Sequence, residues 1–571
     1  MRNHREWVCL CGGLQLLVLL WPRPVAASWP SDPLVNVPLC TATGEQYFPA
    51  IVADGSGGAI VTWWDMRSGS GDIYAQRISA SGAPLWGANG VALCTASGDQ
   101  SNPAIVSDGA GGATVVWSDL RGGLKYDIYV QRISATGTPM WTTDGVALCT
   151  AGGNQQSPVV TTDGAGGAIV AWFGQFAGHY DIYAQRISAT GTPMWTINGV
   201  ALCAAAGDQE SPTIIPDDAG GAIVSWFDQR SGSDYTFADI YAQRISSSGA
   251  PMWTPEGVAL CTATGSQQNP NIAPDGAHGA IVTWFDGRNG NYDIYAQRVS
   301  DAGAVQWAAD GVALCTAAGE QAMPTLVPDG TGGAIVTWRD YRSGSEYDAY
   351  AQRISGSGSP QWAANGVAVC TATGDQYDPR ITSDGAGGAI VAWPDLRNGS
   401  DLDVYAQRLS PGGAPQWTDE GVTLCTAAGY QNVVTPVSDG AGGAIATWGD
   451  HRGGGDYDIY AQRVQANGVL GGDVTSVPGG GTRELVLAPV TPNPTHRGRL
   501  MVRFTLPSGS PALLELFDVS GRRIAARQVG SLGAGVHSLD LAESRDLAPG
   551  LYLVRLRQGS HALVTRVAML E

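Results

Sequence analysis

The sequence predicts an all-β protein, an eight-bladed β-propeller followed by a β-sandwich. One unit occurs eight times at a spacing of 54 to 58 residues, and each copy holds four short stretches of strand character separated by turns. No stretch shows the periodicity of a helix. Four antiparallel strands in a repeat of this length are typical of propeller blades. A chain of 571 residues is also too long for one ordinary core.

The four stretches are clear in the first copy. Residues 50–53 precede a D-G-x-G-G turn, in which Gly supplies the positive φ of a tight hairpin. Residues 59–63 are β-branched and aromatic, residues 73–79 alternate with a period of two, and residues 90–94 follow a turn and a Trp. Each copy carries the tetrad Y-A-Q-R, once Y-V-Q-R, after a Trp, which is Trp63, Trp117, Trp172, Trp226, Trp284, Trp338, Trp393 or Trp448.

The two ends of the repeat region predict a closed ring over residues 34–470. Residues 34–40 (L-V-N-V-P-L-C) match the fourth strand, G-V-A-L-C, whereas the last copy stops after its third strand at residues 458–464. We therefore expect the N-terminal strand to complete the last blade and to leave no unpaired edge. The alternative is an open solenoid, which would carry polar caps at both ends.

The N-terminus has the features of a secretory signal peptide over residues 1–27. Arg2 and Arg5 precede an apolar stretch at residues 7–21, and the small residues 25–27 offer a cleavage site. The apolar stretch is shorter than the ~20 residues of a membrane-spanning helix, although an uncleaved anchor is the alternative. We expect a bacterial protein that is secreted or held at the outer cell surface, monomeric, and without a transmembrane segment in the mature chain.

The charge of the chain excludes one class of partner. The net charge is -19 and is carried by the repeats, whereas the segment after about residue 483 is slightly basic. An acidic surface repels phosphate backbones and anionic membranes, so no nucleic acid is expected as a partner.

Eight cysteines remain outside the predicted signal peptide, one at the same place in each copy. Equivalent positions in neighbouring blades lie beyond the Cα separation of about 7 Å that a disulfide allows. The sequence also lacks the C-x-x-C pair that is typical of zinc sites. We expect buried free thiols, no metal site and no cofactor. Calcium is the alternative at Asp-Gly turns such as Asp108-Gly109 and Asp384-Gly385. The cysteines are Cys40, Cys94, Cys149, Cys203, Cys261, Cys315, Cys370 and Cys425.

Motifs that repeat are expected to be structural, and departures from the repeat are the candidate sites. W-x-D-x-R occurs in seven copies and one Gln column in all eight, which favours contacts between blades over a single ligand site. The third copy departs at Gly174 and Phe176, and the fourth has an enlarged loop at residues 231–238. These departures predict an aromatic binding patch, and tolerated drift in surface loops is the alternative. The predicted binding residues are Phe173, His179, Tyr235 and Phe237; no catalytic residue is predicted.

Residues 485–571 resemble a known export module. P-N-P at residues 492–494, L-E-L-F-D-V-S-G-R-R-I at 514–524 and the later L-A-P-G-L-Y-L-V-R-L resemble the C-terminal sorting domain of type IX secretion substrates and the related immunoglobulin-like domain named after the flagellar hook scaffold protein. The resemblance implies a seven-stranded sandwich that directs export across the outer membrane and has the secretion machinery as its partner. The Gly-rich residues 471–484 are predicted to be a linker.

The repeats resemble two propeller families more loosely. Residues 72–86 look like the repeat of quinoprotein dehydrogenases, whose G-x-x-x-W tryptophans dock onto the next blade, but the Asp of that motif and the adjacent-cysteine disulfide are missing. D-G-x-G-G is similar to the aspartate box of sialidase-like propellers. We expect a binding scaffold without catalysis that recognises protein or carbohydrate on one face. The alternatives are an enzyme, either a glycan-cleaving hydrolase or lyase or a quinone-dependent oxidoreductase, and a structural surface-layer protein.

Overall fold

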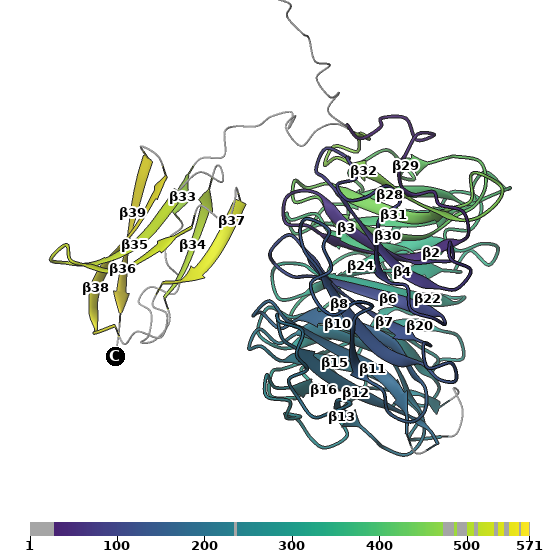
Figure 1. The fold of residues 1–571 in the computed structure, drawn as a ribbon, viewed down its shortest axis with the longest axis horizontal. Helices are drawn as coiled ribbons and strands as arrows, with labels where there is room; N and C mark the ends of the chain where they lie inside the picture. Colours follow the sequence, from purple (N-terminus) through teal and green to yellow (C-terminus); the bar gives the residue numbers. More distant parts are fainter. Residues whose placement is uncertain are drawn as a thin grey trace, which may run out of the picture. The chain divides into compact units, whose positions relative to one another are not determined.

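The protein is described from a computed structural model, which divides the chain into two compact units, Met1–Val474 and Thr475–Glu571 (Figure 1). The all-β class is confirmed, because the described residues form strands and turns and contain no α-helix. Nor does any helix in these residues have the length and apolarity to cross a membrane. The described residues are 28–176, 178–232, 237–471, 485–487, 500–506, 512–529, 535–541, 547–558 and 561–569.

The first unit consists of eight four-stranded antiparallel sheets that follow one another along the chain. The first sheet is β2 (Gln46–Ala53), β3 (Ala59–Asp65), β4 (Asp72–Ile78) and β5 (Val91–Cys94). Six sheets repeat this order: β6 (Gln100–Ser107), β7 (Ala113–Asp119), β8 (Asp127–Ile133), β9 (Val146–Cys149); β10 (Gln155–Thr162), β11 (Ala168–Gln175), β12 (Tyr180–Ile187), β13 (Val200–Cys203); β14 (Gln209–Pro216), β15 (Ala222–Asp228), β16 (Asp239–Ile245), β17 (Val258–Cys261); β18 (Gln267–Pro274), β19 (Ala280–Asp286), β20 (Asp293–Val299), β21 (Val312–Cys315); β22 (Gln321–Pro328), β23 (Ala334–Asp340), β24 (Asp348–Ile354), β25 (Val367–Cys370); β26 (Arg380–Ser383), β27 (Ala389–Asp395), β28 (Asp403–Leu409), β29 (Val422–Cys425).

The eighth sheet joins the two ends of the repeat region. Its strands β30 (Gln431–Ser438), β31 (Ala444–Asp450) and β32 (Asp458–Val464) are completed by β1 (Val37–Cys40), which pairs antiparallel with β32 as expected from the sequence. Each sheet contacts the next, and the eighth contacts β2 of the first. At that junction the Gln46 amide donates to the Tyr457 carbonyl at 2.7 Å.

A tryptophan that the sequence analysis did not use also joins the ends. In seven copies the Trp that precedes the fourth strand packs on a Gly of the next sheet. Trp86 lies so close to Gly137 that a Cβ there would come within 2.6 Å of its ring. The last copy has no such Trp. Trp29, which is 2 % exposed, packs instead on Gly82 and donates to the Ala80 carbonyl at 3.0 Å. The N-terminal segment therefore supplies both a strand and a docking Trp.

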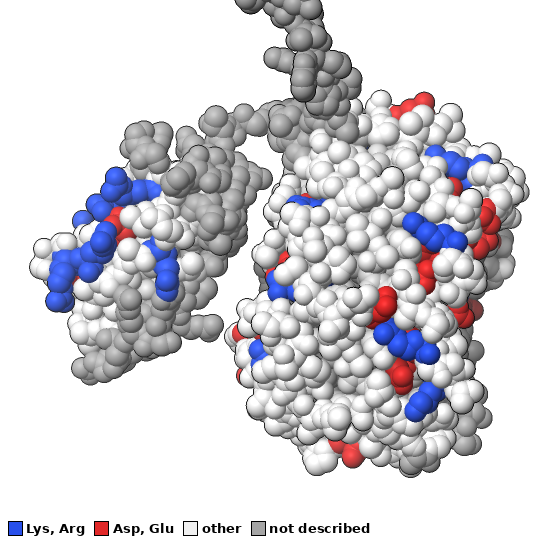
Figure 2. All heavy atoms as spheres, in the orientation of Figure 1, with Lys and Arg blue, Asp and Glu red and all other residues white. Residues whose placement is uncertain are grey.

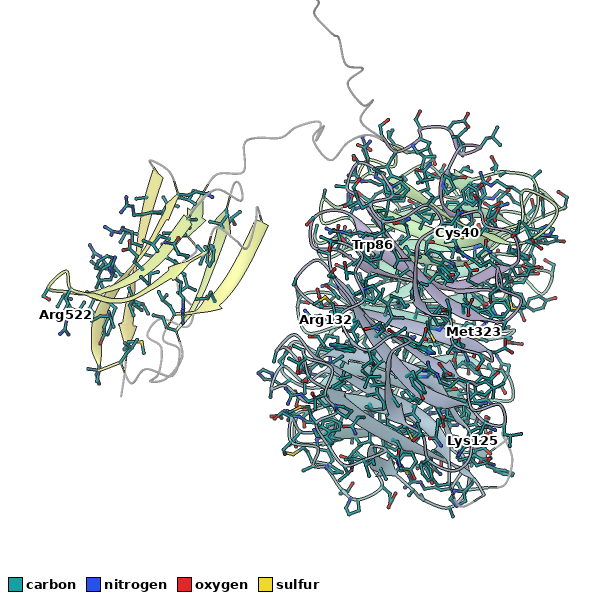
Figure 3. All side chains as sticks on the ribbon, viewed as in Figure 1. Cys40, Trp86, Lys125, Arg132, Met323 and Arg522 are labelled. Atoms are coloured by element: carbon teal, nitrogen blue, oxygen red, sulfur yellow. The ribbon has the colours of Figure 1, made fainter. Side chains whose placement is uncertain are left out.

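The loops of the propeller are divided between two faces. The β3–β4 loops and the connections to the next sheet lie together, because the Met66 amide donates to the Glu45 carbonyl and the Gln100 amide to the Gly71 carbonyl. We call this the loop face; the D-G-x-G-G turns and the docking tryptophans lie on the opposite face, the turn face. Figure 3 accordingly places Trp86 on one side of the propeller and Met323 toward the other.

The second unit has two sheets around one core. Strands β33 (Val486–Leu487), β34 (Met501–Leu506) and β37 (Gly535–Asp540) form one, and β36 (Arg523–Gln528), β35 (Ala512–Asp518), β38 (Gly550–Gln558) and β39 (His561–Met569) form the other. Phe504, Leu514 and Val554 are buried between them. The sorting-domain assignment stays a prediction. The predicted signal peptide, residues 472–484 of the linker and the P-N-P motif lie outside the described residues.

Candidate binding site at the mouth of the central channel

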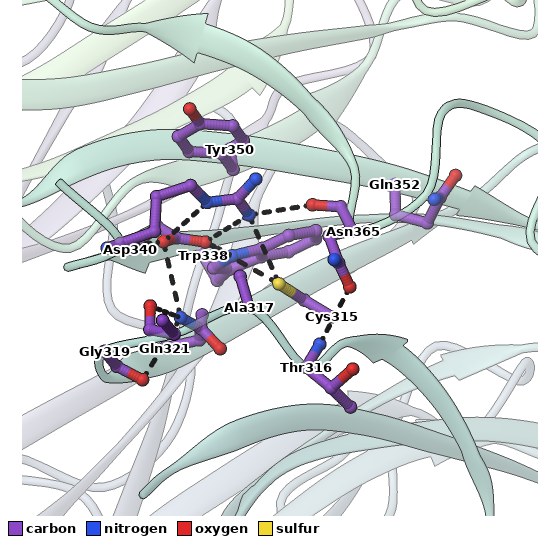
Figure 4. A network of polar contacts seen from close by, with 12 residues as sticks. Cys315, Thr316, Ala317, Gly319, Gln321, Trp338, Asp340, Tyr350, Gln352 and Asn365 are labelled. Carbon is purple, nitrogen blue, oxygen red and sulfur yellow. Dashed lines mark hydrogen bonds and ion pairs between the residues drawn. The ribbon is translucent and has the colours of Figure 1, made fainter.

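The repeated W-x-D-x-R motif links neighbouring sheets. In the sixth copy the Trp338 indole N–H donates to Asp340 at 2.8 Å, and Arg342 binds both oxygens of the same carboxylate (Figure 4). Arg342 also donates to Cys315 at 3.2 Å and lies over the Tyr350 ring at 3.7 Å. Cys315 belongs to the fifth sheet and Asp340 to the sixth, so the structural interpretation of the motif is confirmed.

The third copy compensates for its departure from this motif. Gly174 and Phe176 replace the Asp and Arg, and the Trp172 indole N–H donates instead to the Gln155 side-chain oxygen at 2.9 Å. Phe176 packs on Tyr183 with ring centroids 4.4 Å apart, where other copies place a guanidinium. The substitution therefore completes local packing and does not open a site.

The eight thiols are free and buried, as expected. Burial is the main cause that raises their pKa, to about 12 for Cys40 and about 11 for Cys149. A thiol with so high a pKa carries almost no thiolate at neutral pH, so these cysteines act as small apolar residues.

The Asp-Gly turns, where calcium is the alternative, have a carboxylate that the protein's own donors already bind. The Asp54 carboxylate already accepts the Ser56 and Gly58 amides at 2.7 and 2.9 Å. Arg77 donates to its other oxygen at 2.8 and 3.0 Å, so a guanidinium occupies the place of a cation. In the described parts of both units no three His, Cys, Asp or Glu side chains are grouped to hold a metal ion.

An Asp is the first or second residue of the third strand of every sheet, buried in seven sheets and half-buried in the eighth. Desolvation raises the pKa of all eight. The pKa of Asp348, Asp403 and Asp458 reaches about 6, with nearby carboxylates adding to the effect of burial. Perturbed carboxyls often mark active sites, but a feature that recurs in eight sheets does not define one. We assign it to the architecture.

The structure describes three of the four binding residues predicted from the sequence, and they differ in burial. Phe173 is only 9 % exposed and packs edge-on against Tyr180 in the core between the third and fourth sheets, so it is not a surface aromatic. His179 is about one-third exposed, with Nδ1 3.2 Å from Asp181, and Phe237 is 53 % exposed. Tyr235 lies outside the described residues.

One cavity is lined by side chains that differ between copies. They come from the first strand of a sheet or, in the seventh sheet, from just before β26. Seven of these strands carry a bulge, such as that between Tyr47 and Ala50 in β2. One residue at this point in every sheet has a positive φ, between 34° and 55°, and none is Gly. These eight residues, the mouth ring, are Phe48, Asn102, Ser157, Ser211, Asn269, Met323, Asp378 and Val433.

Most of the mouth ring lines one cavity, which we call the channel mouth. Seven of its members, all except Val433, line a cavity of about 460 Å³ together with Arg380 and five of the prolines that follow them. This volume lies in the range that holds a small ligand.

The backbone of the mouth ring is strained. Non-Gly residues with positive φ cost about 1–3 kcal/mol each, and a following proline, present in seven copies, restricts the backbone further. Gly relieves such strain at other positive-φ positions, including Gly44 and Gly82. In the mouth ring side chains are kept despite the strain and differ between copies, whereas the Gln two residues earlier is the same in all eight.

An aromatic cluster adjoins the cavity at the junction of the eighth and first sheets. Tyr47 packs edge-on against both Phe48 and Tyr457, with centroids 4.7 and 4.8 Å apart. The Asn432 side-chain amide donates to the Tyr47 hydroxyl at 2.6 Å. Phe48 is 49 % exposed and presents an apolar surface to the channel mouth.

An ionic cluster adjoins the cavity at the sixth and seventh sheets. Arg339 donates to Asp378 at 3.1 Å, lies 3.9 Å from Glu320, and has its guanidinium 4.8 Å from the Tyr347 ring centroid. The first strand of the seventh sheet, β26, is only four residues long. Just before it, the Tyr377 amide donates to the Pro394 carbonyl, and Pro394 has no amide hydrogen to return.

The comparisons with known proteins assign no family. No family model and no curated protein matches the chain. Among solved structures, an α-L-arabinanase from Penicillium chrysogenum complexed with arabinobiose is 12% identical, with 65% of this chain and 94% of that chain covered and a TM-score of 0.34. A protein of unknown function from Dyadobacter fermentans is 10% identical over 53% and 93%, and the Hadza microbial sialidase Hz136 is 11% identical over 57% and 71%, each with a TM-score of 0.32. Likeness at this level carries no argument about function.

Proposed function

We propose that the propeller binds a carbohydrate at the channel mouth and is not itself a catalyst. The observation that carries this proposal is the mouth ring: eight strained residues of six different types, seven of which line one cavity. Backbone strain that persists without a packing need points to function. The ligand site inferred here differs from the patch that the sequence alone suggested.

The chemistry of the cavity suits a sugar better than a protein. Phe48 offers an apolar face, and Asn102, Asn269, Ser157 and Ser211 offer hydrogen-bond donors and acceptors of the kind that hydroxyl groups require. A stable protein partner needs about 800 Å² on each side. A concave site of about 460 Å³ fits one or two sugar rings instead.

Catalysis is less well supported than binding. Cleavage of a glycosidic bond requires two carboxyl groups flanking it, and Asp378 is the sole acidic residue among those that line the cavity. Its carboxylate is held by Arg339. Quinone chemistry of the resembled kind uses a disulfide between adjacent cysteines, and the eight described cysteines are all free.

A glycan array tests the proposal with matched variants. Wild-type protein should bind a subset of the glycans on the array. The variants Asn269→Ala and Phe48→Ala should no longer bind these glycans, while their melting temperature stays that of the wild type. Phe237→Ala is the control, because Phe237 is as exposed as Phe48 but does not line the cavity. Retention of no glycan by the wild type, or loss of binding in Phe237→Ala alone, would contradict the proposal.

We also propose that the second unit directs export of the propeller to the cell surface or medium. The resemblance over residues 485–571 and the predicted signal peptide support this. In a host with type IX machinery, protein lacking residues 485–571 should accumulate in the periplasm while the full chain leaves the cell. Normal export of the truncated protein would make the sandwich an ordinary accessory domain.

A further inference from the structure

We propose that the ligand of the channel mouth is an anionic carbohydrate whose acidic group binds Arg380. This inference rests on the proposed function and adds the chemical class of the ligand. It also rests on the ion pairs that the arginines form in the described part of the propeller.

Nearly every arginine of the propeller is paired with a carboxylate. Residues 28–471, apart from 177 and 233–236, contain seventeen arginines, and sixteen have a carboxylate oxygen within 4.0 Å. On the side drawn in Figure 2 the basic side chains of the propeller accordingly lie beside acidic ones. Arg380 is the exception. The chain has 51 acidic residues against 32 basic ones, so its lack of a partner does not come from a shortage of acids.

Arg380 lines the cavity at a position where the other sheets carry a small or neutral side chain. It is the first residue of β26, pairs in register with Ala392, and is exposed. A large cation has therefore replaced a small residue at one point of the channel wall. The equivalent residues are Ala50, Ala104, Val159, Thr213, Asn271, Thr325 and Thr435.

The nearest acid in the chain does not use the donors of Arg380. Asp378 lies two residues earlier, and its carboxylate accepts from Arg339 at 3.1 Å. Arg339 in turn lies 3.9 Å from Glu320, so this second arginine is already shared between two acids. Arg380 therefore lines the cavity without a carboxylate partner. The planar fork of donors of a guanidinium matches a carboxylate or sulfate bidentately.

A carboxylate and a sulfate could both bind Arg380 as bidentate acceptors, and a glycan array distinguishes between them. The array should carry uronic-acid glycans, their methyl esters, sulfated glycans and neutral glycans of equal length. We expect wild-type protein to bind uronic-acid or sulfated glycans at least ten-fold better than neutral ones. The class that keeps binding identifies the source of the anion, and methyl esterification should abolish uronate binding.

Three variants place the effect on one side chain. Arg380→Gln should weaken binding of the acidic glycan ten-fold or more, Arg380→Lys should retain part of it, and Phe48→Ala should weaken all glycans alike. Raising the salt from 0.05 to 0.5 M should weaken wild-type binding but barely affect what Arg380→Gln retains. An unchanged melting temperature shows that each variant is folded.

The outcomes separate this inference from the proposed function. If neutral glycans or methyl esters bind as well as the acids and Arg380→Gln binds like the wild type, the anionic class is wrong while carbohydrate binding stands, provided that Phe48→Ala loses it. If the wild type retains no glycan of any class, both proposals are wrong.

Discussion

Replacing a strained residue of the mouth ring by Gly should stabilise the protein. Ser211 has a φ of 52°, and the structure gives its hydroxyl no hydrogen-bond partner among the described residues. Left-handed backbone costs a non-Gly residue about 1–2 kcal/mol, whereas Gly loses about 0.5–1 kcal/mol more backbone entropy on folding. Ser211→Gly should therefore raise the free energy of unfolding by about 0.5–1 kcal/mol, measured by urea denaturation, and should weaken glycan binding.

The control is a serine without a positive φ in the first strand of another sheet. Ser101 precedes the mouth ring residue of β6 and pairs with Ser118 across the sheet, with no positive φ. Ser101→Gly should lower the free energy of unfolding by about 0.5–1 kcal/mol, because Gly weakens a strand interior. If Ser211→Gly destabilises as much as Ser101→Gly, the mouth ring is not strained and its use as a sign of function fails.

Four further predictions concern the architecture. Trp29→Ala should lower the free energy of unfolding by about 3–5 kcal/mol in calorimetry, because it removes a large buried side chain at the ring junction; an unchanged melting temperature would show that this Trp does not hold the ends. Gly137→Ala should destabilise more than Gly109→Ala, since both have positive φ but only at Gly137 would a Cβ meet the Trp86 ring, at 2.6 Å, and equal effects would disprove the clash. Burial above all, and nearby carboxylates, raise the pKa of Asp348 from 3.8 to about 6, so the stability linked to its protonated form is fully present below about pH 3.8 and is lost as the pH rises through 6. Asp348→Asn should thus raise the melting temperature relative to the wild type at pH 7–8 and not at pH 4; the same gain at both values would refute the linkage. Finally, a thiol reagent should titrate eight groups in the denatured mature chain and react slowly with the native protein, whereas disulfides found by mass spectrometry would contradict the burial of free thiols.

The sequence predicted the blades well because the repeat shows each constraint eight times. Cys40 and residues 34–40 revealed the strand that completes the eighth sheet, since β1 copies the fourth-strand motif. Trp29 was missed because it lies outside the repeat and matches only the last residue of G-x-x-x-W. The first strand was predicted too short, as residues 50–53 and not Gln46–Ala53, because the bulge at Phe48 interrupts the alternation.

The site was predicted less well than the fold, for a physical reason. Phe173 and Phe237 were predicted as binding residues, but aromatic identity does not reveal burial, and Phe173 fills the core between two sheets. The mouth ring leaves a signal in the sequence, a variable residue before proline in an otherwise constant repeat. Its meaning depends on the positive φ and on the convergence of eight strands, and neither can be read from one copy.

The central claim is that a carbohydrate binds within the mouth ring. Its most direct test is a crystal structure of the propeller with the glycan that the array retains most strongly. We expect the sugar in the cavity bounded by Phe48, Asn269 and Arg380, with its acidic group on the Arg380 guanidinium. A glycan found on the turn face, or at the exposed loop around Phe237, would contradict this account.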